Sequence, residues 1–435
     1  MYNLEKMISN PQTSPTATGT DSRKAILVGT TRPGSPGGEA SLDELEGLAT
    51  TAGYRPVARY LQPLHTVNPK TFIGSGKVRE LAEAAAWHHP EVVIFDEALS
   101  PAQNKHLENA LGCRVMDRQG LILEIFSDHA RTREARTQVE LARLKYALPR
   151  LTRMWGHLSR QRGGIGLREV GEKQLQLDKR MIRDQIHKLE KQLERIDRER
   201  QVQRRSRRRA FQVALVGYTN VGKSTLMNLL TEAETRVENK LFATLDATVR
   251  KVKKNFPYPI LLADTVGLID KLPHDLVASF KSTLDEVRDA KLLLHVVDLS
   301  HPDYQKQMET AERLIAELGA DRTERILVFN KIDRVKDPAV LDQACRRWPE
   351  AVFISCREKT GLDRLRQAIV SAYEKHLPRL RTRLPYERAQ VLPEIRKNAL
   401  VVAEDYRPEG IDLDLRIFPE RRARLEHLLN GHAGK

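Results

Sequence analysis

Residues 217–225, GYTNVGKST, have the composition and spacing of a phosphate-binding loop. The apolar segment FQVALV precedes this G-x-x-x-x-G-K-[ST] pattern, and the helix-like TLMNLL overlaps its end. Glycines let the backbone wrap closely around phosphate oxygens, while successive N–H groups and a helix N-terminus supply positive potential. In this context Lys223 is expected to reach the β- and γ-phosphates, and the Ser224 hydroxyl is expected to bind Mg²⁺.

A second segment, ADTVGLID at residues 263–270, ends another apolar run. Asp264 is the expected carboxylate beside Mg²⁺, bound through water, and the Gly267 amide can bond a γ-phosphate and lose that bond on hydrolysis. Many such switches have a glutamine after this glycine to orient the attacking water, but here Leu268 follows. Because its side chain forms no hydrogen bonds, we expect slow intrinsic hydrolysis.

The segment NKID, residues 330–333, closes a third apolar run and predicts guanine recognition. The Asp333 carboxylate can accept from both the ring N–H and the exocyclic amine of guanine, whereas adenine would leave it unpaired. Asn330 can bond the base and brace the phosphate loop, and the Lys331 stem can lie along the base. The backbone N–H groups of SCR, residues 355–357, should face the guanine carbonyl.

The segment LFATLDATVR, residues 241–250, lies where a first switch segment belongs. A second protein ligand of Mg²⁺ should come from it, because a hydroxyl on a mobile loop can arrive with the nucleotide. Thr244 and Thr248 are both candidates.

Composition indicates which kinds of partner the chain binds and in which cellular compartment it works. The chain of 435 residues has a formal net charge of +15 and a pI near 9.7, which indicates an anionic partner such as nucleic acid or a membrane surface. Three scattered cysteines indicate a reducing compartment without disulfides or a zinc site. The N-terminal residues lack a signal-peptide pattern, and no apolar run reaches the ~20 residues of a membrane span. We expect a cytoplasmic protein without stable membrane insertion.

Positioning these motifs requires several domains. Residues 1–22 have the composition of a disordered tail. Residues 23–128 alternate helical patterns with candidate strands at AILVGT, VVIFDE and around RVMDRQGLILEIF, which predicts an N-terminal α/β domain. Residues 210–376 predict a P-loop, Ras-like GTPase domain with a mostly parallel sheet of FQVALVG, PILLAD, KLLLHVVD, RILVFN and AVFIS. Residues 377–435 predict a small α+β domain with the strand GIDLDLRIF and a helix at RRARLEHLLN.

Residues 129–209 have a different character. Apolar residues recur at spacings of three and four, which predicts two long amphipathic helices packed as an antiparallel hairpin. These residues are Leu141, Leu144, Leu148, Leu151 and Trp155, then Leu175, Ile182, Ile186, Leu189, Leu193 and Ile196. The Gly-rich, charged stretch SRQRGGIGLREVGEK is the expected loop between them. The second helix ends in RRSRRR, residues 204–209, which favours contact with phosphates.

Together, these motifs resemble those of the HflX-type GTPases. The resemblance rests on GYTNVGKST, LFATLDATVR, DTVGLI and NKID after a basic helical hairpin, and on TFIGSGKVREL and VVIFDEALSPAQNKHLENAL before it. It covers residues 24–376 and, more loosely, the C-terminal segment. It implies a translational GTPase-like factor that binds the large ribosomal subunit and its rRNA, and that separates stalled or idle ribosomes when GTP is bound. We expect the ribosome to stimulate hydrolysis, and we expect a monomer.

The resemblance also assigns site residues. Phe242 to Asp246 would form the first switch, and Thr244 is favoured over Thr248. The expected catalytic residues are Lys223, Thr244 and Gly267, and the expected Mg²⁺ ligands are Ser224 and Thr244. The expected GTP- and GDP-binding residues are Gly217, Tyr218, Thr219, Asn220, Val221, Gly222, Lys223, Ser224, Thr225, Phe242, Ala243, Thr244, Leu245, Asp246, Asp264, Thr265, Val266, Gly267, Asn330, Lys331, Ile332, Asp333, Ser355, Cys356 and Arg357.

Two other functions remain open at this point. An RNA-binding module could keep a nucleotide site for structural reasons alone. A GTPase could instead place the basic hairpin on anionic lipid, with a membrane-peripheral fraction. The hairpin loop lacks the Trp-, Phe- and Leu-rich apolar face that interfacial binding needs, which disfavours the membrane hypothesis.

Overall fold

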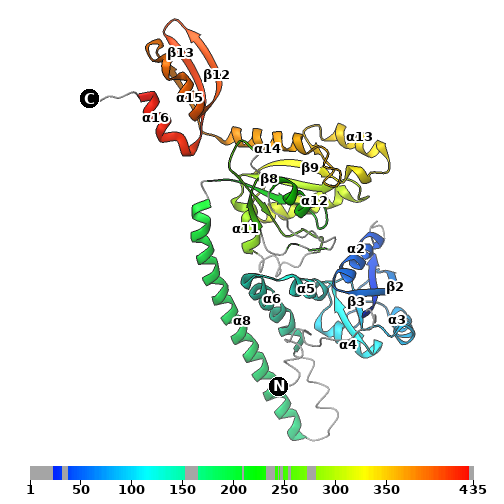
Figure 1. Cartoon of the computed structure of the whole chain (residues 1–435). Coiled ribbons are helices and arrows are strands. Elements are labelled where there is room, and N and C mark those ends of the chain that lie inside the picture. The colour runs from blue at the N-terminus through cyan, green and yellow to red at the C-terminus, as the bar shows by residue number, and fades with distance from the viewer. Residues whose placement is uncertain are drawn as a thin grey trace, which may run out of the picture. The chain divides into compact units, whose positions relative to one another are not determined.

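The computed structural model describes residues 23–31, 38–151, 165–207, 210–231, 241–242, 244, 248–252, 256–271 and 281–430 (Figure 1). Residues 165–175, 201–207, 281–284, 420 and 430 are described by their backbone alone. The chain divides into two compact units. The first comprises Met1–Ile125 and Tyr146–Leu177, and the second comprises Phe126–Lys145 and Asp178–Lys435.

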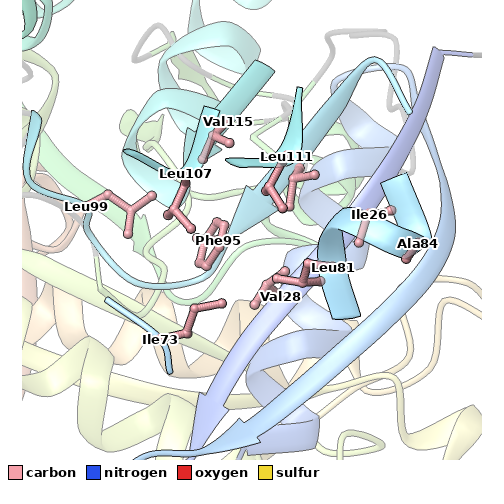
Figure 2. Close-up of a cluster of buried hydrophobic side chains, with 11 residues drawn as sticks. Ile26, Val28, Ile73, Leu81, Ala84, Phe95, Leu99, Leu107, Leu111 and Val115 are labelled. Atoms are coloured by element: carbon pink, nitrogen blue, oxygen red, sulfur yellow. The ribbon is translucent and has the colours of Figure 1, made fainter. Parts of the chain in front are cut away.

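The first unit contains a four-stranded parallel sheet in the order β2-β1-β3-β4. Its elements, followed by the helix that continues into the second unit, are β1 (Arg23–Thr31), α2 (Gly38–Thr51), β2 (Tyr54–Pro63), α3 (Ser75–His88), β3 (Val92–Phe95), α4 (Pro101–Leu111), β4 (Arg114–Asp117) and α5 (Arg118–His129). All four residues of β3 are buried, as is typical of a parallel strand covered on both faces. Figure 2 shows Phe95 of this strand among Val28, Leu81, Leu107 and Val115 in one apolar cluster.

Local signals explain where helix α4 begins and ends. The Ser100 side chain accepts from the Gln103 N–H and the Gln103 side chain accepts from the Ser100 N–H, so the two form a capping box. Pro101 occupies the first turn, and Gly112 closes the helix in the left-handed region at φ 67°.

The expectation of a strand around RVMDRQGLILEIF is wrong beyond its first residues. Strand β4 ends at Asp117, and the apolar run LILEIF lies within helix α5. Leu121, Ile122, Ile125 and Phe126 are all buried. A helix that is apolar around most of its circumference has no clear 3.6-residue period, so a short apolar run does not distinguish it from a buried strand.

Two long helices follow, α6 (Arg133–Leu151) and α8 (Ile165–Arg207). Within the second unit, Thr137 bonds Gln192 at 3.4 Å and Glu140 bonds Gln185 at 2.9 Å, so the helices run antiparallel. Leu141, Leu144 and Ile182 are buried, in agreement with their periodicity. No helix of the described residues combines the length and the apolarity needed to cross a membrane.

The second long helix begins earlier than expected. Helix α8 begins at Ile165, so Gly166 and residues up to Lys173 have a helical backbone (Figure 1). The Leu, Arg, Glu and Lys residues of this stretch are good helix formers, which offset a cost of about 1 kcal/mol for each glycine. Trp155 and residues 152–164 lie outside the described residues.

The second unit contains a six-stranded sheet in the order β10-β9-β8-β5-β7-β6, parallel except for β6. Its elements are β5 (Phe211–Val216), α9 (Lys223–Leu230), β6 (Thr248–Lys251), β7 (Ile260–Asp264), α11 (Lys281–Asp289), β8 (Leu292–Asp298), α12 (Tyr304–Glu317), β9 (Glu324–Asn330), α13 (Pro338–Arg347), β10 (Val352–Phe353) and α14 (Leu362–His376). The expected parallel core is confirmed, whereas the partly buried antiparallel edge strand β6 was not predicted. All six residues of β5 are buried.

A three-stranded antiparallel sheet in the order β11-β13-β12 forms the C-terminal α+β part of the second unit. Its elements are β11 (Arg379–Leu384), α15 (Leu392–Asn398), β12 (Ala399–Arg407), β13 (Gly410–Ile417) and α16 (Arg422–Asn430). Ile411, Leu413, Leu415 and Ile417 alternate along β13 and are buried, which agrees with the predicted period of two.

Candidate functional site

The predicted site segments follow the carboxyl ends of parallel strands in the six-stranded sheet. Residues 217–222 follow β5, Asp264 ends β7, Asn330 ends β9, and residues 355–357 follow β10. These strands are parallel, so their carboxyl ends lie at one edge of the sheet. Ligands of open α/β sheets bind at this edge.

The phosphate loop connects β5 to α9, and a lysine at its end donates hydrogen bonds to the loop's own carbonyl oxygens. Lys223 is buried, and its Nζ donates to the carbonyl oxygens of Gly217 at 2.9 Å and Tyr218 at 2.6 Å. Burial lowers the pKa of Lys223 to about 8, opposed by the charge of Asp264. Gly222 has φ 98°, and a Cβ there would clash with the Asn330 amide. Glycine is therefore required where the loop meets the guanine motif.

Three side-chain oxygen groups converge beside Lys223. The Ser224 Oγ lies 2.8 Å from the Thr244 Oγ1, and both hydroxyls donate to the Asp264 Oδ2, at 2.7 Å and 3.1 Å. Burial raises the pKa of Asp264, while Lys223 and the two hydroxyls oppose the shift. The competing candidate, Thr248, lies in β6 in register with Asp264.

This cluster fits a magnesium ion. Hydroxyl and carboxylate oxygens are the ligands that Mg²⁺ prefers. The Asp264 Oδ1 is buried and has no hydrogen-bond partner among the described residues. Burying a carboxylate oxygen without a hydrogen-bond partner costs folding free energy, and a cation bound nearby would offset this cost.

The predicted guanine residues are held by neighbouring groups. The Asn330 Nδ2 donates to the Val221 carbonyl at 2.8 Å, which ties the guanine motif to the phosphate loop. The Asp333 Oδ1 accepts from the Ser355 Oγ at 2.6 Å. Lys331, at φ 62°, forms an ion pair of 2.7 Å with the Asp298 carboxylate. Asp298 and the Ser355 hydroxyl were not predicted, although Asp298 also ends a strand, β8.

The Cys356 N–H and the Thr265 hydroxyl both form hydrogen bonds within the protein. The Cys356 N–H, expected to face the guanine carbonyl, donates to the Asn330 Oδ1 at 3.1 Å. Burial raises the pKa of the Cys356 thiol to about 12, so it is a poor nucleophile. The Thr265 Oγ1 donates to the Leu215 carbonyl at 2.6 Å and therefore braces β5.

The first switch segment is described in part. Ala243, Leu245 and Asp246 lie outside the described residues. Phe242 is buried at φ 57°, and its ring meets the Phe126 ring edge-on at 4.8 Å within the second unit. A phenylalanine in the left-handed region is uncommon and requires support from its surroundings. This packing fixes the backbone two residues before Thr244.

The remaining predicted residues have varied environments. Val266 is buried after β7, Thr225 lies in the first turn of α9, Ile332 begins the short 3₁₀ helix Ile332–Arg334, and Arg357 is exposed. The phosphate-loop residue Thr219 is buried, whereas Asn220 is exposed at φ 59°.

Comparison with known proteins covers most of the chain. Residues 39–127 match the family described as "GTP-binding GTPase N-terminal", residues 129–207 match "GTP-binding GTPase Middle Region", and residues 212–331 match "50S ribosome-binding GTPase". A relative from Caldanaerobacter subterraneus, named GTPase HflX, is 42% identical over 411 residues, which cover 94% of each chain. The Escherichia coli relative of the same name is 44% identical over 347 residues, 79% of this chain and 82% of its own.

Among solved structures, a GTP-binding protein from Sulfolobus solfataricus in complex with GDP is 24% identical, with a TM-score of 0.45. The match covers 80% of this chain and 98% of that protein. The assignment rests on the sequence relatives, which share at least 40% identity over most of their own length. The chain belongs to the HflX family of GTPases.

Proposed function

We propose that the chain is a GTP-hydrolysing switch that binds the large ribosomal subunit and separates stalled or idle ribosomes into subunits when GTP is bound. The curated relatives bear the name GTPase HflX, and one matched family is described as a 50S ribosome-binding GTPase. A ribosomal partner implies a cytoplasmic location. The observation that carries the proposal is a guanine-nucleotide site and a strongly basic helical arm on the same chain.

In this proposal, residues 217–225 hold the phosphates, and Asn330, Lys331 and Asp333 read guanine. Ser224 and Thr244 hold Mg²⁺, with Asp264 acting through water, and the ion would neutralise charge on the β- and γ-phosphates. The Lys223 ammonium stabilises the charge that develops during phosphoryl transfer. The Gly267 N–H senses the terminal phosphate and releases the switch when that phosphate is lost.

The positive charge of the chain is concentrated on the arm, residues 129–209. This segment has 24 lysines and arginines against 10 aspartates and glutamates, so it accounts for nearly all of the formal net charge of +15. Lys and Arg side chains that neutralise phosphates release counterions from nucleic acid, and this release drives binding. Ribosomal RNA is therefore the partner that the arm fits.

Hydrolysis in the free protein should be slow, because Leu268 is buried and cannot polarise water. We infer that the ribosome orders the switches or supplies a group near the attacking water. Completion of a GTPase site in trans is worth about 10³–10⁵ in rate.

Ribosome-profile sedimentation tests the proposal. Intact ribosomes are incubated with the full chain and GTP, GDP or a non-hydrolysable GTP analogue, and Lys223→Ala serves as the control. We expect subunits to appear with GTP and with the analogue, and intact ribosomes to persist with GDP or with the variant. Equal profiles in all four conditions would refute the proposed function.

A further inference from the structure

The segment after β7 is fastened to the phosphate loop through the backbone of Leu268. The Leu268 N–H donates to the Gly217 carbonyl at 3.1 Å, and the Thr219 N–H donates to the Leu268 carbonyl at 2.8 Å. The Leu268 side chain is 6% exposed. Both backbone polar groups of this residue are therefore used, and its side chain has no polar atom to orient water.

A third bond comes from a side chain of the phosphate loop itself. Tyr218 stands between the two loop residues that bond Leu268, and its ring is buried. Its hydroxyl accepts from the Asp270 N–H at 2.7 Å. Neither the G-x-x-x-x-G-K-[ST] pattern nor Leu268 requires a tyrosine at this position, so the phosphate-binding role leaves this hydroxyl unexplained.

The three bonds place Gly267 against the phosphate loop. A Cβ at Gly267 would lie 2.7 Å from the Thr219 Cγ2, 2.9 Å from the Thr219 Cα and 3.3 Å from the Lys223 Nζ. The Gly267 backbone thus lies beside the lysine that would reach the terminal phosphate. Bonds at residues 268 and 270 limit how far this backbone can move away.

We propose that Tyr218 is a positioning residue for hydrolysis, which fixes Asp270 and thereby holds the Gly267 N–H towards the terminal phosphate. This inference rests on the proposed GTPase function. Because Leu268 stands where a glutamine would orient the water, the position of the Gly267 backbone determines how well the site stabilises the transition state of hydrolysis. A displacement of about 1 Å can cost about 10²-fold in rate. GDP has no terminal phosphate, so its affinity depends on other contacts.

The variant Tyr218→Phe removes the hydroxyl and keeps the ring. We expect single-turnover GTP hydrolysis to slow about 10-fold, with or without large ribosomal subunits, since part of the geometry survives through Leu268. The GDP dissociation constant, measured by calorimetry on the same full chain, should stay within about twofold, because the Asn330 and Asp333 contacts and the phosphate loop remain.

Tyr258→Phe is the matched control. The Tyr258 hydroxyl donates to the Glu374 Oε1 at 2.7 Å, so this variant also loses one tyrosine hydrogen bond. It should hydrolyse GTP at the wild-type rate. Wild-type hydrolysis by Tyr218→Phe would overturn the inference, as would an equal loss of hydrolysis and GDP affinity. A wild-type chain that hydrolyses no GTP under either condition would instead refute the proposed function.

Discussion

At the scale of single residues, the proposed guanine selectivity depends on the Asp333 carboxylate, which a neighbouring hydroxyl already orients. The Asp333 Oδ1 accepts from Ser355, so the carboxylate is held for a base that offers two donors. Asp333→Asn should raise the GDP dissociation constant about 10²-fold, because two bonds to a charged acceptor are lost or reversed. It should also favour xanthosine diphosphate, whose second carbonyl can accept from the new amide.

Asp337→Asn is the control for this experiment. Asp337 caps α13 by accepting from the Ala339 N–H at 2.9 Å and lies in the same region of the chain. Calorimetry with both diphosphates measures the change. Unchanged GDP affinity in Asp333→Asn would contradict the assigned guanine site.

A second residue-scale prediction concerns pH. Burial lowers the pKa of His295, in the central strand β8, from 6.5 to about 4, and Arg325 and Lys223 add to the effect. Below pH 6.5 the unfolded chain takes up this proton more readily than the folded chain. The stability that depends on neutral His295 is therefore complete above pH 6.5 and is lost as the pH falls towards 4.

At pH 5 the loss should be about 2 kcal/mol for this one group. His295→Leu removes the titration, so urea unfolding of this variant should weaken less between pH 7.5 and 5 than that of the wild type. His106→Leu, which replaces an exposed histidine, should keep the wild-type dependence. Identical pH dependence in all three proteins would show that His295 does not titrate as a buried group.

Motif spacing was a good guide to the residues that approach the site, and a poor guide to the groups that hold them. Lys223 and Ser224 begin helix α9, Asp264 ends strand β7, and Thr244 joins them from the first switch segment. The supporting role of Asp298 depends on the neighbouring strands β8 and β9, and sequence order alone does not report a contact between adjacent strand ends.

At the scale of elements, one buried carboxylate connects helix α6 to the N-terminal sheet. Asp117, fully buried at the end of β4, accepts from the Leu99 and Gly120 N–H groups, the Tyr146 hydroxyl and the Arg150 guanidinium, at 2.8–3.2 Å. All five residues belong to the first unit. The C-terminal end of helix α6 is therefore fixed to the sheet by a buried carboxylate that accepts four hydrogen bonds.

Asp117→Ala should destabilise the first unit by about 3 kcal/mol, since it leaves the Arg150 charge without its buried partner. Hydrogen exchange of peptides from residues 92–125 and 146–151 should accelerate accordingly. Glu91→Ala, which breaks the exposed Arg23–Glu91 pair, should cost less than about 1 kcal/mol. Equal exchange in the two variants would contradict the role of Asp117.

The elements that the sequence predicted well are those with a clear period or a buried strand between turn signals, such as β5 and β13. The edge strands β2 and β6 were missed, because they are only partly buried and lack a continuous apolar run. Helix α5 was misread for the opposite reason, since burial around most of its surface removes the helical period.

At the scale of the whole molecule, the distribution of charge predicts how binding to ribosomes depends on salt. Three arginines near the end of α8 can be replaced by glutamine and compared with three exposed basic residues elsewhere in the second unit. The two sets are Arg204, Arg205 and Arg207, and Arg322, Lys336 and Arg364. If each arginine of the first set contacts a phosphate, replacing all three should flatten the slope of log affinity against log salt by about 2 to 3. The second set should leave the slope unchanged, and equal slopes for both sets would place the contact elsewhere.

The most direct test of the account is equilibrium binding of purified large ribosomal subunits to the full chain, in the presence of a non-hydrolysable GTP analogue and then of GDP, at one fixed salt concentration. We predict binding at least about 10-fold tighter with the analogue, a coupling of about 1.4 kcal/mol between the terminal phosphate and the basic arm. Equal affinity in the two nucleotide states would contradict the claim that the guanine-nucleotide site controls binding of the arm to ribosomal RNA.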